Sequence, residues 1–296
     1  MKLRTLLLSA VLICAGMTAQ AQLKITFNPV KGQTYSYRFN TDQINKMMMG
    51  QDMTMKTVTD LLMEMTVREN NGKEITMDYA YKEIVLTSSN EWMGDIKFDS
   101  KNKNAGASEP EQLIAQIMKC LIGKTMQVVI LPDGTVKSIT GFNAIQDEMQ
   151  KIMASNSMGQ MGGMYLQMFD EAAMKNNFEQ TFKMLPDKEI KAGDSWNNNL
   201  SFLTNGFMAI DIKNTFTLKS VSNDIALIDV VSTTNMKATE NMEGELKGDQ
   251  KGETRLNVKT GMPVQLTSLG TAKGQFSAQG MDFSSEITTK TTVTLQ

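Results

Sequence analysis

The sequence predicts a mainly β protein of the α+β class, built on a large curved antiparallel sheet or half-barrel with a central helical insert. Three observations support this fold class. Apolar and polar residues alternate over long stretches towards both ends of the chain, which places one face of each strand in a core and the other in water. Glycines recur on the apolar face of one stretch, which favours a bent sheet. Helical spacing of apolar residues is confined to the middle.

The start of the chain has the pattern of an export signal. Lys2 and Arg4 precede a short apolar run, and an Ala-Gln-Ala triplet ending at Ala21 forms a cleavage site. The run is too short to remain as a membrane span. Ile13 before Cys14 is not the small residue that a lipoprotein signal requires. We therefore expect a periplasmic or secreted protein, cleaved after Ala21, that is neither a typical lipoprotein nor membrane-spanning.

Residues 1–21 form this signal peptide, and residues 22–296 are predicted to form one β-rich domain. Two possible β halves and the helical insert between them cover 22–141, 186–296 and 142–185. The segments Val30–Tyr35 and Ile190–Trp196 are similar, and each precedes a set of strands. Related halves and the repeated use of the same turn chemistry both explain this similarity, and the sequence favours neither.

Strands in the first half follow from alternation with period two. Apolar residues share one face from Met55 up to a hairpin turn at Asn70–Gly72. The returning strand begins at Ile75, and its apolar phase slips near Lys82–Ile84, as it does at a β-bulge. A second turn at Leu131–Gly134 joins two short strands.

Helices are predicted in the middle of the chain. The Ser108–Glu111 segment is a capping box with a proline near the helix start, and Gly123 is expected to end that helix. A second helix is predicted from about Asn143. A third covers about Tyr165–Leu185, where Pro186 stops it.

Long strands are predicted again in the last part of the chain. Between Met242 and Val258 the even positions are small or apolar, except for Gln250 and one threonine, and the odd positions are polar or charged. The segments 264–278 and 281–295 continue this alternation. The glycines on the inner face of the first segment are Gly244, Gly248 and Gly252. We expect the strand to bend sharply there or to let another group approach closely.

Composition excludes several classes of function. The chain has no histidine, which removes Ser-His-Asp catalysis and His-based zinc sites. A net charge of −2 without a basic patch argues against a nucleic-acid partner. Cys120 lies on the apolar side of the first helix, which predicts a buried, inert thiol. Asp78, Glu83 and Asp194 show no spacing typical of a catalytic pair, so we expect no enzyme activity and no cofactor.

Methionine is in excess, with 26 residues. One cluster contains 47–49, Met53 and Met55, and the other contains Met158, Met161, Met164 and Met168. Thioether sulfur is a ligand for Cu(I), so a methionine-based Cu(I) site is one alternative. Methionine also fills irregular cores and lines adaptable grooves. The second cluster is interrupted by glycines and is predicted to lie between helices that cover the sheet.

Four turn motifs follow one another along the chain: Lys31–Tyr35, Gly123–Lys124, Leu131–Val136 and Leu185–Trp196. Their order and spacing resemble an uncharacterised secreted family of unknown function that is common in Bacteroidota. The resemblance extends over nearly the whole mature chain and implies no established activity or site residues. At the level of the fold alone, the expected sheet with helices is similar to periplasmic lipoprotein carriers.

We therefore expect an exported, non-catalytic protein that binds an apolar ligand or envelope component, such as a lipid or an apolar peptide, between sheet and helices. The expected lining residues are Met149, Met153, Met161, Met164, Met168, Phe178 and Phe182. Besides Cu(I) binding, one alternative is a structural or protein-interaction module of the cell envelope whose helices simply fill the sheet. A cavity of about 300 Å³ or more supports a ligand, and a filled interior supports the module.

Overall fold

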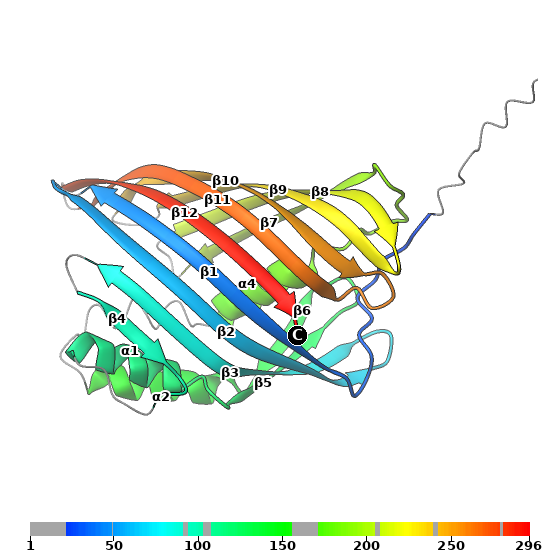
Figure 1. The fold of residues 1–296 in the computed structure, drawn as a ribbon, viewed down its shortest axis with the longest axis horizontal. Coiled ribbons are helices and arrows are strands. Elements are labelled where there is room, and N and C mark those ends of the chain that lie inside the picture. Colours follow the sequence, from blue (N-terminus) through cyan, green and yellow to red (C-terminus); the bar gives the residue numbers. More distant parts are fainter. Residues whose placement is uncertain are drawn as a thin grey trace, which may run out of the picture.

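The structure is a computed structural model in which long, twisted strands form one open, curved antiparallel sheet (Figure 1). This arrangement confirms the predicted fold class. The residues that it describes are 22–48, 50–90, 94–102, 108–155, 171–204, 208–238, 242–278 and 281–296. The predicted signal peptide and the second methionine cluster lie outside them.

Strands make up most of the described chain, and its helices are confined to the middle. The first six strands are β1 (Thr34–Met48), β2 (Asp52–Asn70), β3 (Ile75–Asn90), β4 (Ile96–Asp99), β5 (Thr125–Ile130) and β6 (Val136–Thr140). The other six are β7 (Ser195–Thr204), β8 (Met208–Ser222), β9 (Ile225–Ala238), β10 (Met242–Asn257), β11 (Pro263–Ala278) and β12 (Met281–Leu295). The described helices are α1 (Glu109–Lys119), α2 (Phe142–Ala154) and α4 (Glu171–Phe182).

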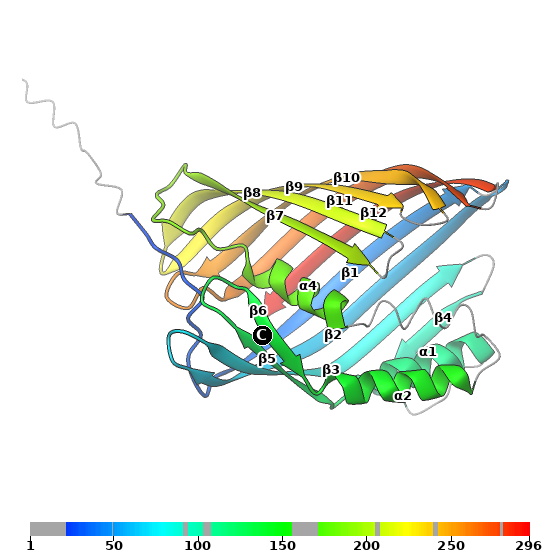
Figure 2. The ribbon, with the colours of Figure 1, turned by 180° about the vertical axis from the view of Figure 1, so that it is seen from behind.

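Strand order explains why a helix lies inside the curve. The sheet runs β6-β5-β3-β2-β1-β12-β11-β10-β9-β8-β7, and β4 pairs with β3. The first and last strands are therefore central neighbours, while β6 and β7 are edges. The chain that connects these edges crosses the open side of the curve, where Figure 2 shows α4. The backbone N–H of Val136 in β6 donates to Glu179 in α4 at 3.0 Å, and Asn198 in β7 donates to the carbonyl of Lys183 just after α4.

The predicted turn and bulge are present between β2 and β3. Gly72 has a φ of +78°, in the left-handed region that favours glycine, and the Asn71 side chain accepts hydrogen bonds from the backbone N–H groups that follow. Leu62 pairs with Glu83 and Met63 with Tyr81, so Lys82 is the extra residue that shifts the register. This shift confirms the predicted slip of phase.

The ends of α1 and α4 differ from the prediction, and the residues that follow each helix form hydrogen bonds with strands. The predicted capping box of α1 is present, with the Ser108 hydroxyl accepting from the Glu111 N–H at 3.3 Å. The helix ends at Lys119, before Gly123, because the Gly123 N–H donates to the Tyr81 carbonyl in β3. Similarly, α4 ends at Phe182, and the next carbonyls accept hydrogen bonds from β7 side chains.

The main core lies where α4 meets the sheet. The ring centroid of Phe178 is 4.5 Å from that of Tyr79, and Phe182 is 4.6 Å from Phe27. A second cluster surrounds Trp196, which is buried at the start of β7. Helices α1 and α2 pack on each other and α1 packs on β4. Aromatic side chains therefore exclude water from one end of the curve.

Glycines allow β10 and β11 to approach each other closely. A Cβ atom at Gly274 would lie 2.1 Å from the Glu245 carbonyl oxygen, and one at Gly252 would lie 2.4 Å from the Thr267 carbonyl oxygen. The two strands approach too closely there for any side chain. The close approach predicted from inward-facing glycines is therefore confirmed.

Candidate functional site

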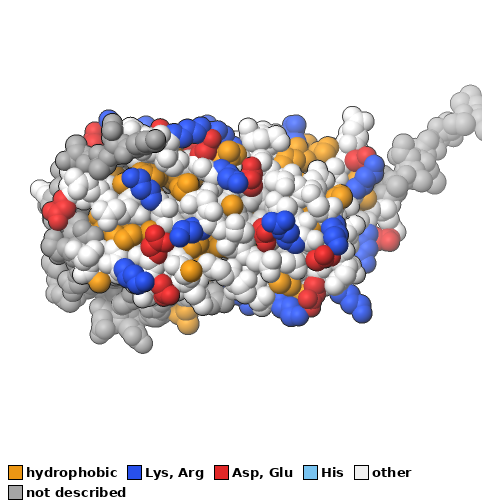
Figure 3. Space-filling model, turned by 90° about the horizontal axis from the view of Figure 1, so that it is seen from below, with side chains coloured by type: hydrophobic (Ala, Val, Ile, Leu, Met, Phe, Trp, Pro, Cys, Tyr) orange, Lys and Arg blue, Asp and Glu red, His pale blue; other side chains and the backbone are white. Residues whose placement is uncertain are grey.

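The concave side of the sheet, which we call the trough, carries no charged strand residue in the part of the chain that the structure describes. Directly paired residues in an antiparallel sheet share a face, so the register assigns each strand residue to the trough or to the convex face. Charges lie on the convex face, with ion pairs such as Lys273–Glu286 at 3.1 Å. On the underside of the molecule, Figure 3 shows hydrophobic side chains scattered among charged and other polar groups.

One transverse row of paired residues crosses the trough from β7 to β3. Its side chains are able to form hydrogen bonds but carry no charge, and one position is glycine. The row consists of Asn198, Asn214, Ser232, Gln250, Gly270, Thr289, Gln43, Thr57 and Ser88. The Ser232 hydroxyl donates to the Asn214 side-chain oxygen at 2.6 Å, and the hydroxyl oxygens of Thr57 and Ser88 are 3.3 Å apart. We call this set the polar row.

Rows of mixed character, such as the one with Phe216, Val230, Ser268 and Thr291, lie directly beside the polar row, and mainly apolar rows follow on both sides. The apolar row on the α4 side lies four residues along each strand from the polar row. It contains Leu218, Ile228, Thr254, Leu266, Val293, Phe39, Leu61 and Ile84. The apolar row on the opposite side lies at the same distance from the polar row. It contains Phe202, Ile210, Met236, Leu246, Gly274, Ser285, Met47 and Met53. The trough is therefore apolar, then polar and uncharged, then largely apolar again along its length.

A cavity of about 270 Å³ lies in the trough between α4 and the sheet. Its floor is apolar and includes Tyr37, Phe39, Met65, Phe216, Leu266 and Val293. Its rim is polar and consists of Gln180, Thr181, Asn214, Ser232, Thr234 and Gln250. Three members of the polar row thus belong to the rim, and one of them, Gln250, is exposed. The cavity offers a dry floor beside groups that both donate and accept hydrogen bonds.

The phenol groups near the cavity stay neutral. The Tyr37 hydroxyl donates to the Pro263 carbonyl at 2.7 Å. Burial raises the pKa of Tyr37 and also the pKa of Tyr79 well above the ordinary tyrosine value. At neutral pH the floor therefore presents no ionised group, which favours an uncharged or apolar guest.

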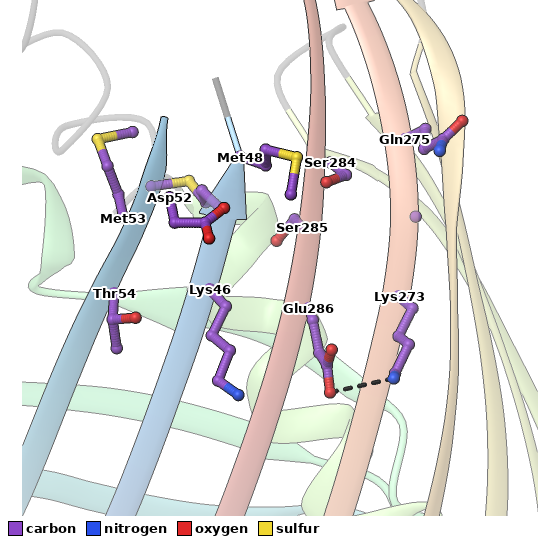
Figure 4. Close-up of a pocket in the computed structure, with 12 residues that line it drawn as sticks. Lys46, Met48, Asp52, Met53, Thr54, Lys273, Gln275, Ser284, Ser285 and Glu286 are labelled. Atoms are coloured by element: carbon purple, nitrogen blue, oxygen red, sulfur yellow. Dashed lines mark ion pairs between the residues drawn. The ribbon is translucent and has the colours of Figure 1, made fainter. Parts of the chain in front are cut away.

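A larger hollow, of about 720 Å³, lies at the tips of β1, β2, β11 and β12 (Figure 4). Its charged side chains, including Lys46 and the Lys273–Glu286 pair, belong to the convex face. Lys273 and Met48 are mostly exposed. Because water already solvates these groups, binding there would bury little apolar surface. The cavity under α4 is therefore the candidate site.

The described residues among the predicted lining set do not line this cavity. Met149 and Met153 of α2 and Phe178 and Phe182 of α4 are all buried in the main core cluster. Met161, Met164 and Met168 lie outside the described residues. Alternation of the sequence had already placed Gln250 on the inner face. It could not show that Gln250 lies beside Ser232 and Asn214, because that proximity depends on the pairing register.

The other residues considered from the sequence have separate environments. Met47, Met53 and Met55 share the trough face at the strand tips, whereas Met48 is exposed on the convex face. Cys120 is buried and its Sγ donates to the Gln116 carbonyl at 3.3 Å; burial raises the pKa of this thiol. The expected buried cysteine is therefore confirmed. Within the described residues, no group of three or more His, Cys, Asp or Glu side chains is placed to hold a metal ion.

The three carboxylates considered for catalysis lie apart, each with its own partner. Asp78 pairs with Arg68 at 2.5 Å, and Glu83 pairs with Lys101 at 2.7 Å. Asp194 accepts a hydrogen bond from the Lys191 backbone N–H at 2.9 Å, within the turn that precedes β7. The structure thus does not bring these carboxylates together.

Within the described residues, no helix has both the length and the apolar character needed to cross a lipid bilayer. Two solved structures align with most of the chain. One, of lipovitellin and its lipid–protein interactions, has a TM-score of 0.48 at 9% identity and covers 90% of this chain and 25% of its own. The other, the COG4313 outer membrane channel from Pseudomonas putida F1, has a TM-score of 0.26 at 6% identity and covers 91% and 97%.

This chain spans only about a quarter of the lipovitellin chain, and likenesses of this extent support no statement on function. No curated protein sequence matches the chain. One family model matches residues 72–263, which is more than half of the sequence. The chain belongs to DUF6263, a family of unknown function.

Proposed function

We propose that this is an exported, non-catalytic protein that binds an apolar ligand in the cavity under α4. Export, cleavage after Ala21, a periplasmic or secreted location and the likeness to lipoprotein carriers are parts of this proposal. One observation carries it: a cavity of about 270 Å³ with an apolar floor opens on a trough whose described strand residues include none that is charged.

The absence of charge in the described trough supports binding because a water-facing strand surface normally carries charged side chains. The convex face of the same strands does so. On β10, the convex positions include Glu245, Lys247 and Glu253, while the trough positions include Leu246, Gly248 and Gly252. A face that only had to stay hydrated would have no reason to exclude charge so completely.

The volume of the cavity suits part of a ligand. Pockets that enclose whole small molecules start at about 300 Å³, which is slightly above the volume here. An elongated ligand could place one end on the apolar floor and continue along the trough. An acyl chain has this shape, and each methylene that it buries contributes about 0.8 kcal/mol.

The test begins with native mass spectrometry of the protein purified from its own host, before and after solvent extraction. We expect a lipid-sized mass that extraction removes. The stripped protein should then bind a fluorescent acyl probe. In Val230→Trp, the indole occupies the cavity that Val230 lines, and we expect at least about tenfold weaker binding of the probe, or about 1.4 kcal/mol.

Val231→Trp is the matched control, because Val231 is the next residue and lies exposed on the convex face. It should bind the probe like the wild type. Circular dichroism and thermal melting would show that both variants are folded. The proposal fails if the stripped wild type does not bind the probe, or if folded Val230→Trp binds it as tightly as the wild type.

A further inference from the structure

We propose that the ligand is an uncharged amphiphile whose acyl chain lies on the cavity floor and whose neutral hydrogen-bonding head group lies on the polar row. This inference rests on the proposed function and adds the chemical class of the ligand. It comes from the juxtaposition of the floor and the polar row, which share Asn214, Ser232 and Gln250 at the cavity rim.

The first argument is the lack of a counter-ion. Proteins that bind carboxylate or phosphate head groups usually offer arginine or lysine, and those that bind ammonium groups offer acidic or aromatic side chains. None of the described strand residues of the trough is charged. On the polar row itself, where none of the described residues is charged or aromatic, a charged head group would lose hydration without gaining a partner, and this loss is costly in a partly buried site.

The second argument is the chemistry of the rim. Asn214 already accepts from the Ser232 hydroxyl at 2.6 Å through its oxygen, so its NH₂ group is oriented by a fixed neighbour. Gln250 is paired across the sheet with Ser232 and is exposed to the trough. Amides and hydroxyls donate and accept. They can therefore form hydrogen bonds with hydroxyls and amides, which also donate and accept, and with esters, which only accept.

The third argument is the order of the zones. Phe216 and Val230 form a pair in the row directly next to the polar row, on the side of α4, and both residues line the cavity. A chain on this floor therefore reaches the polar row immediately at its head end. A wholly apolar ligand would cover the Gln250 amide and the Asn214 NH₂ group without offering them a hydrogen bond, which disfavours its binding.

The experiment compares three ligands with the same ten-carbon chain: monodecanoylglycerol, decanoate and decyltrimethylammonium. Each is titrated below its micelle concentration into the stripped wild type at about pH 8, where the carboxylate is ionised. Affinity is read from displacement of the acyl probe. We expect monodecanoylglycerol to bind about tenfold or more tightly than either charged ligand.

A lysine placed on the polar row should change this order. Gln250→Lys puts a cation beside the head group, so the affinity for decanoate relative to monodecanoylglycerol should rise by about tenfold. Gln275→Lys is the matched control, because Gln275 is also exposed but lies on the convex face of β11. Its ligand preference should stay within about twofold of the wild type, because exposed charges at a distance are screened by salt.

The outcomes separate this inference from the proposed function. If wild type binds a charged ligand as tightly as the neutral one, the inference is wrong while apolar binding stands. If Gln250→Lys has the same preference as Gln275→Lys, the head group does not lie on the polar row. If none of the three ligands displaces the probe from wild type, both proposals fail.

Discussion

Two regions of the trough, the end covered by α4 and the polar row in its middle, are built from the same alternating strands but have different interiors. At the end covered by α4, Tyr37 and Tyr79 are almost completely buried. At the polar row, Gln43 and Thr289 on neighbouring strands β1 and β12 are only half-buried. Alternation determines which side of a strand faces inward. Whether that inward side is dry depends on what covers it.

The side chains follow this difference in cover. Aromatic and aliphatic groups occupy the covered end, where they bury their surface against α4, and hydroxyls and amides occupy the row beyond it. The cavity lies at the boundary between the two regions. A binding site at such a boundary offers both a hydrophobic contribution and directional hydrogen bonds.

The largest expected effect concerns packing at the covered end. Phe182 is 2% exposed and its ring lies against Phe27, so Phe182→Ala should reduce the free energy of unfolding by about 3–5 kcal/mol. Ile287 lies in the open part of the trough and is half-buried, so Ile287→Ala should cost about 1 kcal/mol. Urea denaturation measures both. Equal losses would contradict the distinction between a packed end and an open one.

A second comparison concerns the glycines of β11, where β10 and β11 approach each other closely. Gly274→Ala forces a Cβ against the Glu245 carbonyl oxygen at 2.1 Å and the Leu246 Cα at 2.5 Å, and we expect a loss of about 1–3 kcal/mol. In Gly270→Ala the nearest atom is the Gln250 Cβ at 3.4 Å, so the effect should stay within about 0.5 kcal/mol. Thermal melting compares the variants. If both are tolerated, close strand approach does not shape the trough.

The smallest effect is a dependence on pH. Burial raises the pKa of Tyr37, Tyr79 and Tyr81 in the folded protein. These raised pKa values make the free energy of unfolding depend on pH. It keeps its full value below the unfolded pKa of about 10 and falls as pH rises further, because the unfolded state then releases protons that the folded state keeps. Each buried tyrosine should lower the free energy of unfolding by about 1.4 kcal/mol per pH unit above about pH 10.

Tyr79→Phe should remove one such contribution. Its hydroxyl donates to the Met77 sulfur at 3.9 Å, and because a thioether is a weak acceptor, the variant should lose little stability at neutral pH. Urea denaturation at several pH values up to about 11 gives the slope. An unchanged slope would mean that Tyr79 ionises in the folded state and that water reaches the covered end.

Much of the fold could be predicted from the sequence because its signals are local. Period-two alternation identified β10, β11 and β12, the Asn70–Gly72 turn joined β2 to β3, and the capping box began α1. These features depend on residues that are close along the chain. The ends of α1 and α4 were not predicted because carbonyl and N–H groups of distant strands bind the residues that follow.

The candidate site could not be predicted in the same way. The amphipathic pattern of α4 correctly placed Phe178 and Phe182 inward, but they contact Tyr79 and Phe27, and Gln180 and Thr181 face the cavity instead. The sequence by itself determined which residues face inward, since alternation and glycine geometry are properties of each strand. Only the tertiary structure decided which inward residues are neighbours, because pairing brings residues 43 and 289 together and the edge-to-edge connection sets α4 across the trough.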